Sequence, residues 1–194
     1  MKKLFSDNIE VHGVHRFTVC DISSPKAMKI QAKILELARK PFENRKEFAY
    51  WTAQLRSLFG EMELVQPNVF CTAARSAIAK RMAGTLTYSG TINYGALGTS
   101  TTSPGASDTQ LGAEVYRDTV SSVDISNAAN AIIILSFFYS SNSFTNANVN
   151  EFGTVIDGTA SANTGQLGTH VAFASTINKT NTKSLTVDAQ YTLS

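Results

Sequence analysis

The spacing of apolar residues changes twice along this 194-residue chain. Near the N-terminus apolar and polar positions alternate, which places His15, Phe17 and Val19 on one face of a strand. We therefore expect one or two short strands here, or an arm that pairs with a neighbouring sheet. From Pro25 the period becomes about 3.6, as in amphipathic helices. After Gly84 the chain turns to short runs of β-branched residues separated by turn formers.

Three helices are predicted in the first half of the chain. Ser24 and Pro25 form a helix start, and Pro41 ends this first helix. The second helix covers residues 43–59, and the third runs from about 68 to 82. We expect the apolar stripes of the second and third helices to pack on each other and on a sheet. These stripes comprise Phe48, Trp51, Leu55, Leu58 and Phe59 in the second helix, and Phe70, Ala74, Ile78 and Met82 in the third.

The second half of the chain predicts an antiparallel β-sandwich, because turn signals separate short candidate strands at regular intervals. Ile132 and Ile134 belong to a run that is apolar on both faces, which predicts a buried central strand covered by helices or by another subunit. The fold class is thus α+β, with a β arm and helices over residues 1–84 followed by a sandwich over residues 85–194. The strands are expected near 86–97, 113–124, 130–139, 148–156, 167–177 and 183–193.

Charge is distributed unevenly, although the net charge is only +2. Residues 1–85 carry fourteen Lys or Arg against eight Asp or Glu, whereas residues 86–194 carry three against seven. The basic residues are interleaved with acids along the helices, which favours an ordinary solvated face over a nucleic-acid site. DNA contact by residues 25–82 is the weaker alternative. The opposed signs would suit subunits that pack head to tail.

Cysteine usage and hydropathy point to a soluble chain. Cys20 and Cys71 lie in apolar contexts without a neighbouring Cys or His, so we expect buried free thiols rather than zinc ligands. A single long-range disulfide stays open. No apolar run follows the two N-terminal lysines, and the longest apolar run is too short to cross a bilayer. We expect a protein made in the cytoplasm, without a membrane partner.

The sequence lacks recognisable motifs for reaction chemistry. The patterns of metalloproteases, serine hydrolases, P-loops and dinucleotide folds do not occur, so we expect neither catalysis nor a cofactor. Asp108, Glu114 and Asp118 could form a weak Ca²⁺ cluster, but an Asp that caps a turn beside two surface acids is favoured. The polar loops could hold carbohydrate on an aromatic platform, although loops that fit against neighbouring subunits are favoured. The aromatic candidates are Tyr88, Tyr94, Tyr139 and Phe144.

Residues 92–117 carry the most informative pattern. Residues 93–102 read NYGALGTSTT, and SDTQL (107–111) and EVYR (114–117) follow. This order resembles a recurrent family of tailed-bacteriophage virion structural proteins, in which ALGTGTT is followed by DT-x-L and E-x-x-R. Further similar segments are NANVNEFG (146–153) and a closing hairpin over 170–187 with HVAF, INK and SLTV. AARSAIAKRMAG (73–84) resembles the helix that precedes this domain, so the similarity covers about residues 68–194.

The resemblance implies a non-enzymatic virion component that assembles with itself and docks onto other virion proteins. It would sit in the tail, in the neck or collar, or on the capsid; a receptor- or carbohydrate-binding fibre module is the alternative. The chain departs from the pattern at Gly95, where a larger residue is usual, and at His170, where arginine is common. We expect architectural or interface roles for Gly95 and Gly98 in tight backbone, for Asp108 as a loop cap, and for Glu114 paired with Arg117.

Overall fold

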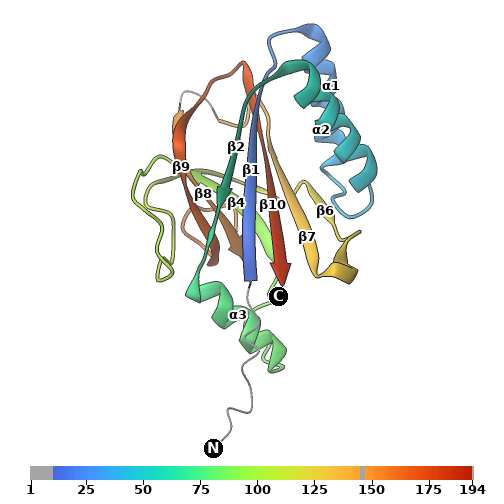
Figure 1. The fold of residues 1–194 in the computed structure, drawn as a ribbon. Helices are drawn as coiled ribbons and strands as arrows, with labels where there is room; N and C mark the ends of the chain where they lie inside the picture. The colour runs from blue at the N-terminus through green and yellow to red at the C-terminus, as the bar shows by residue number, and fades with distance from the viewer. Residues whose placement is uncertain (1–10, 145–146, 194) are drawn as a thin grey trace, which may run out of the picture.

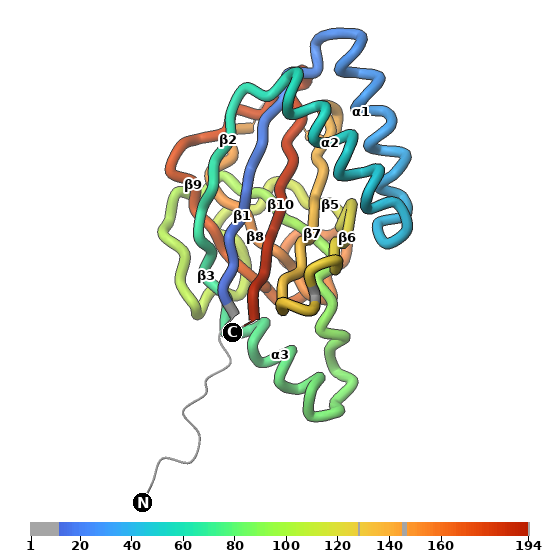
Figure 2. Tube along the Cα trace, turned by 45° about the vertical axis from the view of Figure 1, so that its right-hand side comes forward, coloured from blue at the N-terminus to red at the C-terminus, as the bar shows by residue number. Residues whose placement is uncertain are grey.

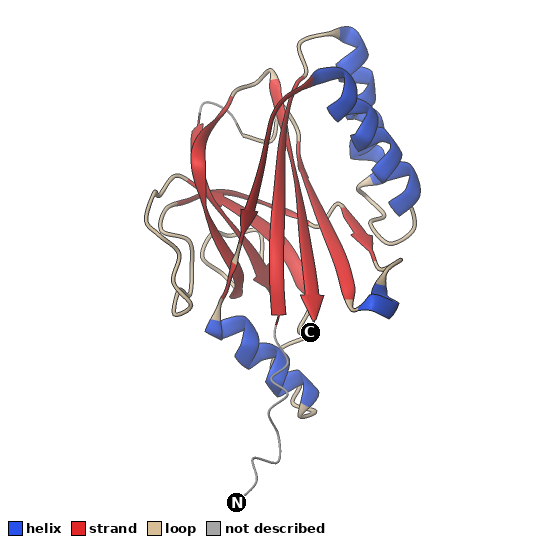
Figure 3. Cartoon of the chain, in the orientation of Figure 1, coloured by secondary structure: helices blue, strands red, loops and turns tan. Residues whose placement is uncertain are grey.

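The computed structural model describes residues 11–144 and 147–193. Within these residues, two antiparallel sheets of five strands each face one another and three α-helices flank them (Figures 1 and 3). The mixed α+β class and the sandwich arrangement are therefore confirmed. The first ten residues, part of the predicted arm, lie outside the described residues.

Sheet A has the order β2-β1-β10-β7-β6, and sheet B has the order β3-β9-β8-β4-β5. The strands of sheet A are β2 (Gly60–Pro67), β1 (Val11–Asp21), β10 (Lys183–Leu193), β7 (Ile132–Tyr139) and β6 (Ser122–Asp124). Those of sheet B are β3 (Val69–Phe70), β9 (Gln166–Lys179), β8 (Ala147–Ile156), β4 (Ile92–Gly98) and β5 (Glu114–Thr119).

Strand β1 lies in the interior of sheet A, not at its margin as an arm would. All eleven of its residues pair with β10, and its other edge pairs with β2. Phe17 and Val19 point into the main core, which they share with residues such as Phe137 and Val187 from the second half of the chain. The expected boundary between residues 84 and 85 therefore falls within one shared core. The alternation of β1 matches that of β10, which is why the two pair over their full length.

The predicted strand over 113–124 is two strands in different sheets. Strand β5 belongs to sheet B and β6 to sheet A, and the chain crosses between the sheets at Val120 and Ser121. Residues 86–91 are not strand, so β4 starts later than expected, at Ile92. A single 3₁₀ turn, Ala128–Asn130, precedes β7. Because a strand pattern has no marker for a change of sheet, sequence alone reads the two strands as one.

Helices α1 (Pro25–Leu37) and α2 (Arg45–Phe59) lie side by side over the outer face of sheet A, towards β7 and β6 (Figures 1 and 2). The predicted start of α1 is confirmed, because Ser24 Oγ accepts a hydrogen bond from Ala27 N at 3.1 Å. The two helices enclose a second core cluster with Phe138 of β7.

Helix α3 (Thr72–Met82) lies at the opposite end of the sandwich, against β9 (Figure 1). The expected packing of the second and third helices on each other is therefore wrong, because α2 packs on α1 instead. Phe70 lies in β3 and not in the helix, and Met82 is 76% exposed. Helix α3 buries only Ala74 and Ala77, so its apolar stripe is narrower than its sequence indicates.

Strand β7 is buried in its second half, not at the isoleucines. Leu135 to Tyr139 are buried, whereas Ile132 to Ile134 are half-buried. The reason is that the helices cover the half of the strand that carries Phe138, while Ile134 lines the open groove beside α2. The prediction that Ile132 and Ile134 lie in a fully buried strand is therefore wrong for this chain on its own.

Candidate functional site

The candidate site is the connection between β4 and β5, residues 99–113, which we call the corner loop. Its two ends are held together because Thr99 N donates to Ala113 O at 2.9 Å. The strands on either side pair in antiparallel register, with an irregularity at Gly98. The loop therefore leaves sheet B and returns to it at adjacent points, and side chains of β8 and β9 help to fix it.

The first attachment is a histidine clamp formed by Asp108, Glu151 and His170. His170 Nδ1 lies 2.7 Å from Asp108 Oδ2, and His170 Nε2 lies 2.9 Å from Glu151 Oε2. Glu151 is fully buried and also accepts hydrogen bonds from three backbone N–H groups of the corner loop. These donors are Ser100, Gly112 and Ala113, at 3.2, 3.0 and 2.8 Å. One carboxylate of β8 thus binds both ends of the loop.

The histidine clamp requires a charged imidazolium, because each ring nitrogen faces a carboxylate that can only accept. Burial lowers the pKa of His170, but hydrogen bonds to Glu151 and Asp108 and their negative charges outweigh it, so that the pKa lies above 6.5. Burial raises the pKa of Glu151, yet the hydrogen bonds from His170 and the loop backbone bring it below 4.5. The three groups therefore hold one another in their charged forms.

Leu111 supplies an apolar attachment for the same loop. Its side chain is buried with Cys71, Ala96, Val155 and Leu167 in a small core cluster outside the main one. The backbone reaches this position because Gly112 turns beside Ser100, where a Cβ atom would lie 2.6 Å from Ser100 Oγ. The corner loop is thus fixed by an ion pair and by packing together.

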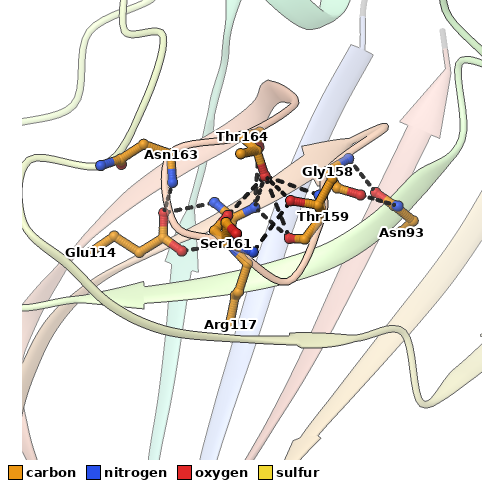
Figure 4. Close-up of polar contacts among 8 residues, drawn as sticks. All are labelled: Asn93, Glu114, Arg117, Gly158, Thr159, Ser161, Asn163 and Thr164. Carbon is orange, nitrogen blue, oxygen red and sulfur yellow. Dashed lines mark hydrogen bonds and ion pairs between the residues drawn. The ribbon is translucent and has the colours of Figure 1, made fainter.

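Beside the corner loop lies an arginine clamp, in which Arg117 of β5 binds Glu114 and the 157–165 turn between β8 and β9 (Figure 4). Arg117 Nε and Nη2 donate to the two oxygens of Glu114 at 2.5 and 2.7 Å. Arg117 Nη1 donates to Thr159 O, Thr164 O and Thr164 Oγ1, each at 3.1 Å. The two charged side chains are only 4% and 2% exposed, so the pair is buried and bidentate.

The 157–165 turn has the backbone shape that this clamp needs. Asp157, Asn163 and Gly165 have positive φ angles, which Asp, Asn and Gly residues adopt most readily in turns. Asn163 N donates to Glu114 Oε2 at 3.0 Å. Asn93 of β4 exchanges two hydrogen bonds of 2.9 Å with the backbone of Gly158, as Figure 4 shows. The turn is therefore fastened to both β4 and β5.

The expected contacts of the site residues are present. Asp108 accepts from Gly105 N at 2.7 Å and so caps the loop, and Glu114 pairs with Arg117. A Cβ atom at Gly95 would lie 2.6 Å from Phe137 Cδ1 and from the Tyr139 hydroxyl, and one at Gly98 would collide with the Glu151 carboxylate. Whether any of these residues lies at an interface stays a prediction.

Two residues of the site were missed by reasoning from chemistry alone. Glu151 and His170 lie far from the loop in sequence, and only their positions within the family pattern marked them. The interpretation of Glu114 as a surface acid is wrong, since it is buried against Arg117. Asp108, Glu114 and Asp118 make separate contacts, and among the described residues no group of three or more His, Cys, Asp or Glu side chains is arranged to hold a metal ion. The Ca²⁺ cluster is therefore not formed.

The aromatic candidates for a carbohydrate platform are all engaged elsewhere. Tyr139 is fully buried, and Phe144 stacks on the Tyr116 ring with centroids 5.0 Å apart. Arg117 lies over the ring of Tyr94, and Lys80 over that of Tyr88.

Comparison with known proteins adds no relative, since no family model, curated protein or solved structure matches the chain.

Cys20 and Cys71 are buried free thiols, as expected, and burial raises their pKa values to about 11 and about 12. None of the helices in the described part of the chain is long and apolar enough to span a membrane. The basic residues of α1 and those of α3 lie at opposite ends of the sandwich (Figure 1).

Proposed function

We propose that this protein is a structural component of a tailed-phage virion, in the tail, in the neck or collar, or on the capsid. It acts by self-association and by docking onto other virion proteins, and it has no catalytic role. Its mechanism is shape and strand complementarity, with a rigid sandwich presenting fixed loops and strand edges to its neighbours.

The observation that carries the proposal is the convergence of the family-like segments. Asp108, Glu114 and Arg117 come from the first segment, Glu151 from the second and His170 from the third. Asp108, Glu151 and His170 fix the corner loop, whereas Glu114 and Arg117 fix the 157–165 turn. Hydrogen-bonded clamps of this kind, buried at Glu114, Arg117, Glu151 and His170, suit an architectural role.

A second residue set in the closing hairpin supports the same interpretation. Lys179 is fully buried, and its Nζ donates to the carbonyl oxygens of Ser141, Phe144 and Thr180 at 3.0 to 3.2 Å. Lys179 thereby fixes the 140–144 loop to the end of β9. Its amine is enclosed and fully bonded, which suits a structural role.

The test is protein analysis of purified phage particles by mass spectrometry, combined with sedimentation of the isolated full-length chain. We expect the protein at a fixed copy number per particle, and rings or larger assemblies in solution. A monodisperse monomer that is absent from particles would overturn the proposal. A stable monomer or trimer that binds immobilised glycans would instead favour the fibre module.

A further inference from the structure

The corner loop consists of a firmly held base and a tip with few attachments. The base comprises residues 99–100 and 111–113. It is held by the hydrogen bond from Thr99 N to Ala113 O, by the three N–H groups that bind Glu151 and by the buried Leu111 side chain. The tip comprises residues 101–110, none of which is buried. The two parts of the loop can therefore respond differently to the loss of one contact.

Two hydrogen-bonded contacts connect the tip to the rest of the described chain. Thr72 N, at the start of α3, donates to Ala106 O at 2.8 Å. Asp108 Oδ2 contacts His170 Nδ1 at 2.7 Å. Between these points the tip forms a compact turn, because Gly105 N donates to Asp108 Oδ2 at 2.7 Å and Asp108 N donates to Gly105 O at 3.1 Å. The ion pair with His170 is therefore one of the two contacts that hold this turn in place.

The protonation of His170 decides whether its contact with the tip is favourable. A neutral imidazole has one N–H and one lone pair, so it can donate to only one of the two carboxylates. Glu151 is fully buried and is held by backbone N–H groups, so it cannot move away from a lone pair that faces its Oε2 atom. The remaining proton therefore stays on Nε2, and the lone pair of Nδ1 faces Asp108. Because the Asp108 side chain is 31% exposed, it can turn into water instead.

We propose that the tip of the corner loop is a pH-dependent flap, which is closed while His170 is charged and opens when the ring loses a proton. Opening separates Asp108 from His170 and Ala106 O from Thr72 N, whereas the base of the loop stays in place. The Thr72 N–H at the start of α3 and the Asp108 carboxylate then contact water. This device belongs to the corner loop itself and is independent of the virion role.

The other ionisable groups around the flap keep a constant charge from pH 6 to pH 9. Asp108 and Glu151 stay ionised, since their pKa values lie below 3.8 and 4.5. Cys71, at the start of α3, stays a neutral thiol because burial raises its pKa to about 12. Arg75, on the exposed side of the same helix, keeps its positive charge. The pH dependence of the flap in this range therefore comes from His170.

The expected direction follows from proton binding. Asp108 and Glu151 both raise the pKa of His170, and opening removes the part that is due to Asp108. His170 therefore binds its proton more tightly when the flap is closed, so closure is favoured at low pH and weakens as the pH rises through the closed-state pKa. A contribution of one pKa unit from Asp108 changes the ratio of closed to open molecules about tenfold. We expect a change of about this size.

The experiment is amide hydrogen exchange of the full-length protein, followed by nuclear magnetic resonance. Thr72 N–H is the reporter, because its hydrogen bond to Ala106 O requires the closed flap. Cys71 N–H is the matched control, since it donates to Gly168 O at 2.9 Å, away from the tip. After correction for intrinsic exchange rates, the protection of Thr72 should fall about tenfold from pH 6 to pH 9. The protection of Cys71 should stay constant.

Two variants separate the flap from a general loss of stability. Asp108→Asn lies on the exposed tip, so the fold should survive, and the protection of Thr72 should become independent of pH. His170→Gln is neutral at every pH, so Thr72 should already be weakly protected at pH 6. If His170→Gln does not fold, Asp108→Asn still provides the comparison.

Three results would overturn the flap. They are a Thr72 protection in the wild type that does not change with pH, an equal fall at Thr72 and Cys71, and a fall at Thr72 that persists unchanged in Asp108→Asn. Each of these results would leave the virion role untouched, because that role is tested by the presence of the protein in particles.

Discussion

His170 and Glu151 form a buried ion pair in which Nε2 lies 2.9 Å from Oε2. The opposite ring nitrogen of His170 contacts Asp108, so both contacts together need a proton on each nitrogen. Glu151 in turn binds three backbone N–H groups of the corner loop. Part of the attachment of that loop to the sandwich, the contact from Asp108 through His170 to Glu151, therefore depends on the protonation of His170.

Raising the pH should weaken the histidine clamp. The folded-state pKa of His170 lies above 6.5, so its stabilisation is fully present below pH 6.5 and is lost as the pH rises through the folded value. Urea unfolding of wild type and of His170→Gln should give a difference in unfolding free energy that shrinks above pH 6.5. A difference that stays constant up to pH 9 would contradict the imidazolium assignment.

The dependence of the unfolding free energy on pH at low pH provides an internal control. The pKa values of Asp108 and Glu151 in the folded state are lowered from 3.8 and 4.5. Their contribution to stability is therefore present above pH 4.5 and is lost as the pH falls through the folded-state pKa values.

A second variant tests the charge of His170 directly. In His170→Arg, which introduces the residue that the family-like pattern has at this place, the side chain keeps its positive charge at neutral and moderately alkaline pH. If it folds, its stability should lack the decline above pH 6.5.

Removing the charge of Glu114 should lower the free energy of unfolding. Glu114→Gln leaves the buried guanidinium of Arg117 without its carboxylate, and breaking a buried pair in this way costs about 3 kcal/mol. Glu36→Gln is the matched control, because Glu36 pairs with Lys33 on an exposed helix face and such pairs contribute about 0.5 kcal/mol. Equal losses in the two variants, measured by urea unfolding, would show that the arginine clamp adds nothing.

Adding one methyl group at Gly95 should destabilise the core. A Cβ atom there would lie 2.6 Å from Phe137 Cδ1 and from Tyr139 Oη, so the strand or the rings must shift. Overpacking of this kind costs about 1–3 kcal/mol. Gly105→Ala is the control, since its Cβ would meet Asp108 at an ordinary 3.4 Å. Thermal unfolding of both variants tests the difference, and a Gly95→Ala midpoint equal to that of Gly105→Ala would refute it.

The buried amine of Lys179 should make stability rise with pH in the alkaline range. Burial lowers its pKa from 10.5 to about 8, so between these values the unfolded chain binds more protons than the folded one. The unfolding free energy of wild type relative to Lys179→Met should therefore increase from pH 8 to pH 10. A flat difference would mean that the three carbonyl contacts preserve an ordinary pKa.

Local features of the fold were predictable because they depend on neighbouring residues. Ser24 caps α1 through a hydrogen bond to Ala27, which is only three residues away. The 157–165 turn follows from Asp, Asn and Gly residues, which adopt positive φ angles readily. The contact of Glu114 with Arg117 was also within reach, since the two are three residues apart on one strand end. In each case the contact depends only on residues that are close together in the sequence.

Long-range choices were not predictable in the same way. The stripes of α2 and α3 are both apolar, yet α2 packs on α1 and sheet A while α3 packs on β9. The strand pattern of residues 113–124 is continuous, yet the chain changes sheets within it. The hydrophobic period predicts which face of a helix or strand is buried. It does not predict which element covers that face, because many partners would bury a similar apolar area.

The sequence by itself determined the strand and helix types, the turn positions and the family-like order of motifs. Only the tertiary structure decided that β1 lies inside sheet A and that Asp108, Glu151 and His170 meet at the corner loop. The physical reason is that a buried ion pair forms only where packing has removed water and aligned donors with acceptors. That condition arises only when folding brings separate segments of the chain together, so it cannot be inferred from any one of them.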